Sequence, residues 1–262
     1  MTTTTTDRPL IELQGITKRF TGVTAVADIS LTVRSGQVLC LLGHNGAGKS
    51  TLIKILSGVH TPTAGTMSID GESVTLGGPR DALDRGIATV HQGAGTVPLM
   101  SVARNFFLGA EPTKGRGLFR RFDAATAGRI ALREIRQLGI RRIRDAGQLV
   151  GTMSGGERQA LVIARALHFG ARVLILDEPT SALGVREAEI VLQAVERARD
   201  RGVGVVLITH QAHHALRVGD HFAVIAHGRL VASFSRGEKE AAEVIDLMAG
   251  GAAMEELERK QA

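Results

Sequence analysis

Aromatic side chains are scarce in this sequence, which has no tryptophan, no tyrosine and eight phenylalanines. An extended stacking surface for single-stranded nucleic acid needs such rings, so the composition argues against one. Cys40 is the single cysteine, which excludes an intramolecular disulfide and favours a cytosolic setting. Its apolar surroundings, "QVLCLLG", are typical of a core residue and not of a reactive thiol.

Long apolar runs are also missing. No uncharged apolar stretch approaches the ~18 residues that a membrane-spanning helix needs, and the start, "MTTTTTDRPL", lacks the apolar segment of a secretory signal. We expect residues 1–9 to form a disordered tail and any membrane role to depend on a partner. The net charge of +6 suits anionic ligands or an anionic membrane face without selecting between them.

The hydrophobic pattern predicts an α/β fold. Residues 10–42 indicate strands, and the continuous apolar run at 38–42 is typical of a strand buried on both faces. A hairpin is expected around Asp70-Gly71. Residues 93–167 predict an inserted helical subdomain, after which strands and helices alternate, as in a parallel sheet covered on both faces. We expect one domain over 10–248, with an antiparallel β subdomain near its start, and a C-terminal tail at 249–262.

A glycine-rich loop, "GHNGAGKST", follows the apolar strand and precedes a helical pattern. It fits G-x-x-x-x-G-K-[ST], in which loop N–H groups surround a β-phosphate, the lysine reaches the β- and γ-phosphates and the hydroxyl binds Mg²⁺. The lysine is Lys49 and the hydroxyl belongs to Ser50. The predicted nucleotide-binding residues are Gly43, His44, Asn45, Gly46, Ala47, Gly48, Lys49, Ser50 and Thr51.

Polar residues end three of the predicted strands, and ligand sites gather at the carboxyl ends of parallel strands. In "VLILDEPT", Asp177 is a candidate Mg²⁺ ligand and Glu178 a candidate for polarising the attacking water. His210 ends "VVLITH" and is a candidate donor to the γ-phosphate, and Gln92 ends "GIATVHQ". The nearby pair His213 and His214 raises a metal site as an alternative, but no third ligand is evident and an exposed helix is the preferred interpretation.

A second helix start that could bind phosphate lies in "GTMSGGERQALVIARAL", at 151–167. Ser154 and Glu157 fit a capping box. That cap does not require Gly155 and Gly156, which weaken a first helical turn by roughly 1 kcal/mol each relative to alanine. The glycines do leave backbone N–H groups open to a closely approaching anion.

In this order, "GHNGAGKST", Gln92, "MSGGERQ", "VLILDEPT" and His210 resemble the nucleotide-binding subunit of ABC transporters, from about Leu10 to Met248. The resemblance implies a P-loop NTPase core and ATP with Mg²⁺ held through Ser50, Asp177 and Gln92. It also implies a head-to-tail pair of identical or paralogous subunits. Each ATP would then lie between the P-loop of one subunit and Ser154, Gly155 and Gly156 of the other, and Phe20 would stack on adenine. Catalysis would fall to Glu178, His210, Gln92 and Lys49.

The segments "VPLMSVARNFFLG", "LSGVHTPTAG" and "PTSALGVREAE" look like the ATPases of bacterial simple-sugar importers. That likeness implies a peripheral subunit on the cytoplasmic face of the membrane. Separate transmembrane permease subunits would touch the segment after Gln92, and a substrate-binding protein would act indirectly. Two departures stand out: Gly184 replaces the aspartate that many ABC proteins carry in "SALG", and Gly-Ala-Gly makes the segment after Gln92 unusually flexible.

The arginine-rich stretch 116–144 leaves one competing class, a soluble ABC ATPase acting on nucleic acid or ribosomes. The sequence has one nucleotide module and no long coiled-coil insertion, which argues against that class. A third class, a small-molecule P-loop kinase, would not account for the motif "MSGGERQ". An importer ATPase without nucleic-acid partners is therefore the preferred hypothesis.

Overall fold

The computed structural model describes residues 8–91 and 95–250, and most of its strands belong to two sheets. An antiparallel sheet has the order β2-β1-β4-β5, from β1 (Ile11–Phe20), β2 (Val23–Val33), β4 (Ala64–Ile69) and β5 (Glu72–Val74). It pairs the first two strands with the hairpin that turns at Asp70-Gly71. The predicted antiparallel subdomain is confirmed.

The second sheet is mainly parallel and has the order β12-β11-β3-β10-β9-β6. Its strands are β3 (Val38–Leu42), β6 (Ile87–Val90), β9 (Val173–Asp177), β10 (Gly204–Thr209), β11 (His221–Ala226) and β12 (Arg229–Ser235). Neighbours run parallel except β11 and β12. The predicted α/β P-loop core is thus confirmed, because the apolar runs that indicated buried strands form this sheet.

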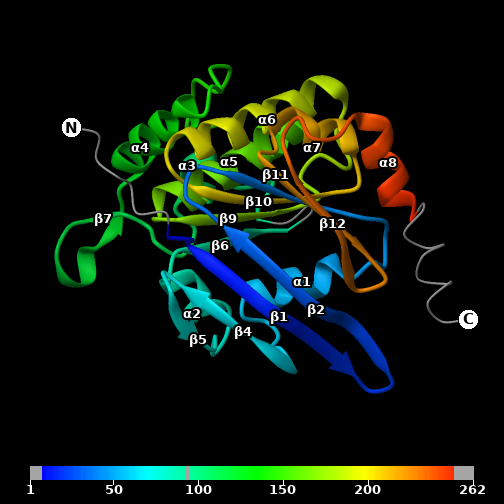
Figure 1. Ribbon diagram of the computed structural model, residues 1–262. Helices are drawn as coiled ribbons and strands as arrows, with labels where there is room; N and C mark the ends of the chain where they lie inside the picture. Colours follow the sequence, from blue (N-terminus) through cyan, green and yellow to red (C-terminus); the bar gives the residue numbers. More distant parts are fainter. Residues whose placement is uncertain (1–7, 92–94, 251–262) are drawn as a thin grey trace, which may run out of the picture.

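Layering follows from the alternation of side chains along the strands. On β3, Leu39 and Leu41 face a core that they share with the antiparallel sheet and with α1 (Lys49–Leu56), which lies between the two sheets (Figure 1). Val38, Cys40 and Leu42 belong to the core on the opposite face. Cys40 is fully buried, and burial raises the pKa of its thiol far above the ordinary value, which fits the predicted core role.

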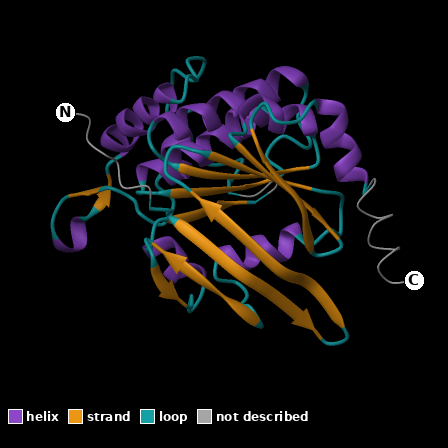
Figure 2. Ribbon diagram, viewed as in Figure 1, coloured by secondary structure: helices purple, strands orange, loops and turns teal. Residues whose placement is uncertain are grey.

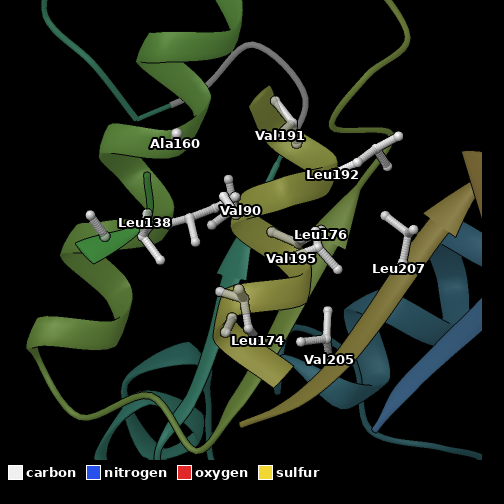
Figure 3. Packing of buried hydrophobic residues seen from close by; sticks show 14 of the residues in the cluster. Val90, Leu138, Ala160, Leu174, Leu176, Val191, Leu192, Val195, Val205 and Leu207 are labelled. Carbon is white, nitrogen blue, oxygen red and sulfur yellow. The ribbon is translucent and has the colours of Figure 1, made fainter. Parts of the chain in front are cut away.

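Helices cover the other face of the parallel sheet (Figure 2). They are α3 (Val102–Phe106), α4 (Ala124–Gln137), α5 (Gly155–His168), α6 (Val185–Asp200), α7 (Ala212–Val218) and α8 (Ala241–Ala249). In Figure 3, Val191 and Val195 of α6 lie close to Leu176 of β9. The short helix α2 (Pro79–Asp84) leads into β6 instead.

The predicted helical insert is only partly helical. Between α3 and α4 the chain forms β7 (Thr113–Lys114), the 3₁₀ turn η1 (Gly117–Phe119) and β8 (Arg121–Phe122), a small hairpin that projects from the body (Figure 1). A second 3₁₀ turn, η2 (Val150–Thr152), precedes α5. Two-residue strands are too short for a hydrophobic period, so the pattern could not reveal them.

The last helix of the described residues, α8, runs from Ala241 to Ala249, where the expected domain meets the expected tail. A capping box of Glu240 and Glu243 starts it. The predicted tails at 1–9 and 249–262 lie largely outside the described residues, and Gln92 lies outside them entirely. Within the described ranges, no helix is long and apolar enough to cross a membrane.

Candidate functional site

The loop between β3 and α1 is shaped by glycines with positive φ. Gly43 has a φ of 143°, and a Cβ there would collide with the carbonyl oxygen of Ile225. Gly48 is the N-cap of α1 at a φ of 108°, and its Cβ would lie 2.6 Å from the carbonyl oxygen of Ala25. Only glycine satisfies both the dihedral angle and the close approach. Since no side chain caps α1, its first N–H groups face the loop.

Lys49 is buried at the start of this helix. Its Nζ donates to the carbonyl oxygens of Gly43 at 2.6 Å and His44 at 2.9 Å, so the cation lies over the loop. Burial lowers the pKa of the ammonium group, whereas the charges of Glu178 and Asp177 act in the opposite direction. A cation held here by carbonyl oxygens is placed to change partners when phosphate oxygens arrive.

A cavity of about 570 Å³ opens over the loop, within the usual size range of small-molecule sites. Its walls combine loop amides and the start of α1 with two carboxylates and a strip of β2. The lining residues are Val23, Thr24, Ala25, Asn45, Gly46, Ala47, Gly48, Lys49, Ser50, Thr51, Asp177, Glu178, His227 and Gly228. The glycine cradle, the lysine and the adjacent Ser50 and Asp177 oxygens fit a nucleotide triphosphate with a divalent cation.

The two carboxylates come from the end of β9. Burial raises the pKa of Asp177, and His91, whose Nδ1 lies 3.8 Å from Asp177 Oδ2, partly opposes that rise. Glu178 follows at a φ of 49°, in the left-handed region that non-glycine residues seldom adopt. Its N–H donates to the carbonyl oxygen of Ile208 at 3.0 Å.

His210 lies where the sequence predicts, just beyond β10. Its Nδ1 is 2.9 Å from Glu178 Oε2, a hydrogen-bond distance. The structure therefore brings together the two residues that were proposed to polarise water and to contact the γ-phosphate. A histidine in contact with a carboxylate can hold it in one orientation.

Three further predicted residues have different outcomes. Phe20 lies at the end of β1, 43% exposed, with its ring 5.3 Å from that of His60, so it is not a core residue. It does not line the cavity, and the role in adenine stacking stays a prediction. His44 does not line the cavity either, and its Nδ1 lies 2.7 Å from the Asn45 carbonyl oxygen. Gln92 falls outside the described residues.

The histidine pair after His210 lies on α7, and the expected exposure holds for only one of the two. His213 is exposed on α7, but His214 is half-buried, and its Nδ1 lies 3.0 Å from Thr180 Oγ1. Burial lowers the pKa of His214, and His213 acts in the same direction. In the described ranges, no cluster of three or more His, Cys, Asp or Glu side chains could hold a metal ion.

The second helix start, at α5, does not line the P-loop cavity of its own chain. Ser154 is the N-cap, and its Oγ accepts from Glu157 N at 3.3 Å, while Glu157 Oε2 accepts from Ser154 N at 2.9 Å. The predicted capping box is present. The Gly155 N–H, however, donates to Glu187 Oε1 at 3.0 Å, a contact that the sequence analysis missed. The spacing Gly184-x-x-Glu187 predicts that Glu187 accepts from the Gly184 N–H, as in one half of a capping box, but it gives no signal for the contact with Gly155.

Comparison with known proteins places this architecture. The family model described as "ABC transporter" matches residues 26–181. The chain is also similar to a nucleotide-free ATP-binding cassette from an ABC transporter, with a TM-score of 0.76 at 21% identity over 94% of this chain and 96% of that one. A dimeric bacterial ABC transporter cassette gives a TM-score of 0.70 at 24% identity over 87% and 100% of the two chains. The chain belongs to the ABC transporter family, and it is an ABC-type ATPase.

Individual relatives are similar over most of the chain. It is 36% identical over 245 residues to the fructose import ATP-binding protein FrcA of Rhizobium meliloti, covering 92% of this chain and 94% of that protein. It is 39% identical to the ribose import ATP-binding protein RbsA 1 of Rubrobacter xylanophilus, covering 97% of this chain and 50% of that protein. The chain thus spans nearly all of the first relative and about half the length of the second.

Proposed function

We propose that this chain is the ATP-hydrolysing subunit of an importer for a simple sugar, with residues 10–248 acting as one cassette. The similar relatives are named as fructose and ribose import ATP-binding proteins, which supports the substrate class. Two copies, or one copy and a paralogue, would close head-to-tail around two ATP molecules. The observation that supports this proposal is that the α5 start lies outside the P-loop cavity of its own chain, so a nucleotide that it contacts would have to be bound by another subunit.

In this mechanism the loop N–H groups and Lys49 bind the triphosphate. Ser50 and Asp177, with Gln92, would hold Mg²⁺, which neutralises phosphate charge when bound. Glu178 accepts a proton from the attacking water, and His210 keeps that carboxylate oriented and donates to the γ-phosphate. Ser154 can take part without losing its cap, because its oxygen accepts from Glu157 N while its own O–H remains a donor.

The arginine-rich stretch 116–144 and the proposed place of the subunit at the membrane both agree with an importer ATPase. Two arginines of the 116–144 stretch make hydrogen bonds within the fold: Arg120 donates to Thr113 Oγ1 at 2.9 Å and Arg133 to Glu134 Oε1 at 2.7 Å. Such contacts weaken the case for a nucleic-acid surface. We place the subunit on the cytoplasmic face of the membrane, bound to separate permease subunits, with a sugar-binding protein acting on the far side.

The test is a Glu178→Gln variant, studied by light scattering and by phosphate release. We expect hydrolysis to fall about 10²–10⁴-fold, the usual contribution of a general base, while ATP still binds. The stalled variant should double its mass with ATP and not with ADP. A variant that hydrolyses at the native rate, or remains single-chain with saturating ATP alone and within an assembled transporter, contradicts the proposal.

A second observation indicates where the permease docks. Val97, Leu99 and Leu149 are exposed apolar side chains, with Leu99 85% exposed. A bridge between Ser101 and Leu149 brings the two segments together, next to the stretch that follows Gln92. Exposed apolar side chains gathered in this way are typical of a protein interface. This apolar patch, Val97, Leu99 and Leu149, is the proposed permease contact.

We expect Leu99→Asp to reduce co-purification of the permease at least tenfold while the isolated cassette hydrolyses ATP normally. Leu83→Asp is the matched control, because Leu83 is also an exposed leucine but lies on α2, outside the patch. Unchanged recovery of the permease with Leu99→Asp would place the contact elsewhere.

A further inference from the structure

Glu187 links two turns, one at Gly155, 32 residues before it in the chain, and one at Gly184, three residues before it. Its Oε1 accepts from the Gly155 N–H at 3.0 Å, and its Oε2 accepts from the Gly184 N–H at 3.3 Å. Gly155 starts α5, and Gly184 is the N-cap of α6. One carboxylate therefore binds the first N–H of α5 and the N-cap N–H of α6, where the positive ends of two helix dipoles also favour a negative charge.

The backbones approach each other at the same point. A Cβ on Gly156 would collide with the Glu187 carbonyl oxygen and lie 3.0 Å from the Glu187 Cα. A Cβ on Gly155 would lie 2.5 Å from Leu183 Cδ2. Close packing against the Glu187 backbone therefore explains Gly156 within the chain, a reason that the sequence analysis did not give, and the role of both glycines toward a phosphate stays a prediction.

The turn that precedes α6 connects this contact to Glu178, the proposed catalytic carboxylate. Ser181 Oγ donates to the Glu178 carbonyl oxygen at 3.1 Å, and the Leu183 N–H donates to that of Thr180 at 3.3 Å. Gly155, Glu178, Ser181, Leu183 and Glu187 all line one cavity of about 290 Å³. A short series of turns therefore connects Glu178 to the carboxylate that holds the start of α5.

We propose that Glu187 is a positioning residue, which fixes the Ser154-Gly155-Gly156 turn relative to the turn at 181–184. This inference rests on the proposed function, in which the α5 start meets the ATP of a second subunit. Both turns then reach that subunit in one fixed arrangement, coupled to the position of Glu178. Without the carboxylate, the α5 start loses an acceptor and becomes free to shift, so closure of the pair needs more ATP.

Two substitutions separate positioning from other roles. Glu187→Ala removes both acceptors, whereas Glu187→Gln keeps one amide oxygen that can accept from Gly155. Glu189→Gln is the matched control, because it removes a carboxylate from the same helix that binds Gln193 and Arg217 instead. Each is made in the Glu178→Gln background, and the ATP concentration for half-maximal mass doubling is measured by light scattering. Binding of fluorescent ADP and the thermal unfolding midpoint are measured alongside.

We expect Glu187→Ala to raise that ATP concentration about tenfold or more, as for loss of a hydrogen bond to a charged group. ADP binding, which uses the P-loop, should stay native. Glu187→Gln should remain within about threefold of the parent, and Glu189→Gln should match it.

An unchanged requirement for ATP in Glu187→Ala overturns the inference while leaving the proposed function intact. Tighter association in Glu187→Gln also overturns it, since it would mean that the carboxylate repels the incoming phosphate. If the parent itself never doubles its mass with ATP, the proposed function fails first.

Discussion

The N-terminal ends of α1 and α5 both carry backbone N–H groups beside glycines, but the two ends differ in how those N–H groups are paired. At α1 the N-cap is Gly48, no side chain caps the helix, and the first turn carries no acidic residue. At α5 the N-cap is Ser154, a capping box is complete, and Glu157 lies in the first turn. Glu187 then takes the Gly155 N–H from outside the helix. The first start leaves its donors to a ligand, whereas the second satisfies several of its own.

This contrast explains why a glycine-rich helix start is not by itself a phosphate site. The α1 start is supported by a buried cation, Lys49, and by a cavity of about 570 Å³ that is formed within one chain. The α5 start has two carboxylates, those of Glu157 and Glu187, in contact with it. In the proposed function it would add the Ser154 hydroxyl and the dipole of α5 to a triphosphate that another subunit binds.

The largest effect on ATP hydrolysis should come from removing the Lys49 ammonium group at the start of α1. Lys49→Ala is expected to lower hydrolysis by at least ~10²–10³-fold, the usual cost of losing a charge-stabilising donor, and to weaken ATP binding. Phosphate release and binding of a fluorescent ATP analogue measure the two effects. Lys54→Ala, an exposed lysine on the same helix, is the control and should leave both unchanged. Near-native binding in Lys49→Ala would mean that the loop amides suffice.

The next effect should come from the glycine that lets α5 approach α6. Gly156→Ala places a Cβ against the Glu187 backbone, so the helices must separate, at a cost of about 1–3 kcal/mol in unfolding free energy. Gly184→Ala is the control, because Gly184 has a φ of −68° and a Cβ there meets no atom within 4 Å. Urea unfolding should show a loss only for Gly156→Ala. Equal stabilities would mean that the approach of α5 to α6 is loose.

The local sequence pattern predicts the structure at the start of α1, but it does not predict the contacts at the start of α5. Gly43 to Thr51 lie in one segment between a strand and a helix, so spacing alone predicts how the loop folds. The partner of Gly155, by contrast, comes from Glu187, and that contact depends on how α5 packs against α6. The pairing of His210 with Glu178 lies between these cases: parallel strand ends predict that they are neighbours, but not that they hydrogen-bond. Contacts between distant segments depend on tertiary packing, which hydrophobic periodicity does not encode.

The smallest effect on the free energy of unfolding should come from the Arg172–Asp70 ion pair, which lies at the surface on the α1 side of the molecule. Arg172, just before β9, makes two hydrogen bonds to the Asp70 carboxylate at 2.6 and 2.7 Å, and this tethers the β4–β5 turn to the parallel sheet. The Arg172 hydrogen bonds hold the pKa of Asp70 below its ordinary value. A lowered pKa stabilises the fold above the unfolded value of about 3.9, and this stabilisation is lost as the pH falls through the folded value.

Asp70→Asn tests this pair and keeps the turn, because asparagine tolerates the left-handed φ of 51° at this position. Both partners are half-exposed, so the loss at pH 7 should be only about 0.2–1 kcal/mol. It should shrink as the pH falls below about 4 and disappear once the pH is below the lowered folded pKa of Asp70. Urea unfolding at a series of pH values from 7 down to about 2 measures it, with Asp84→Asn as a control in a more exposed pair with Arg80. A difference that persists at the lowest pH, where Asp70 is protonated, would assign the effect to the turn and not to the charge. Either result leaves the α1 start unchanged, since neither Asp70 nor Arg172 lines the cavity.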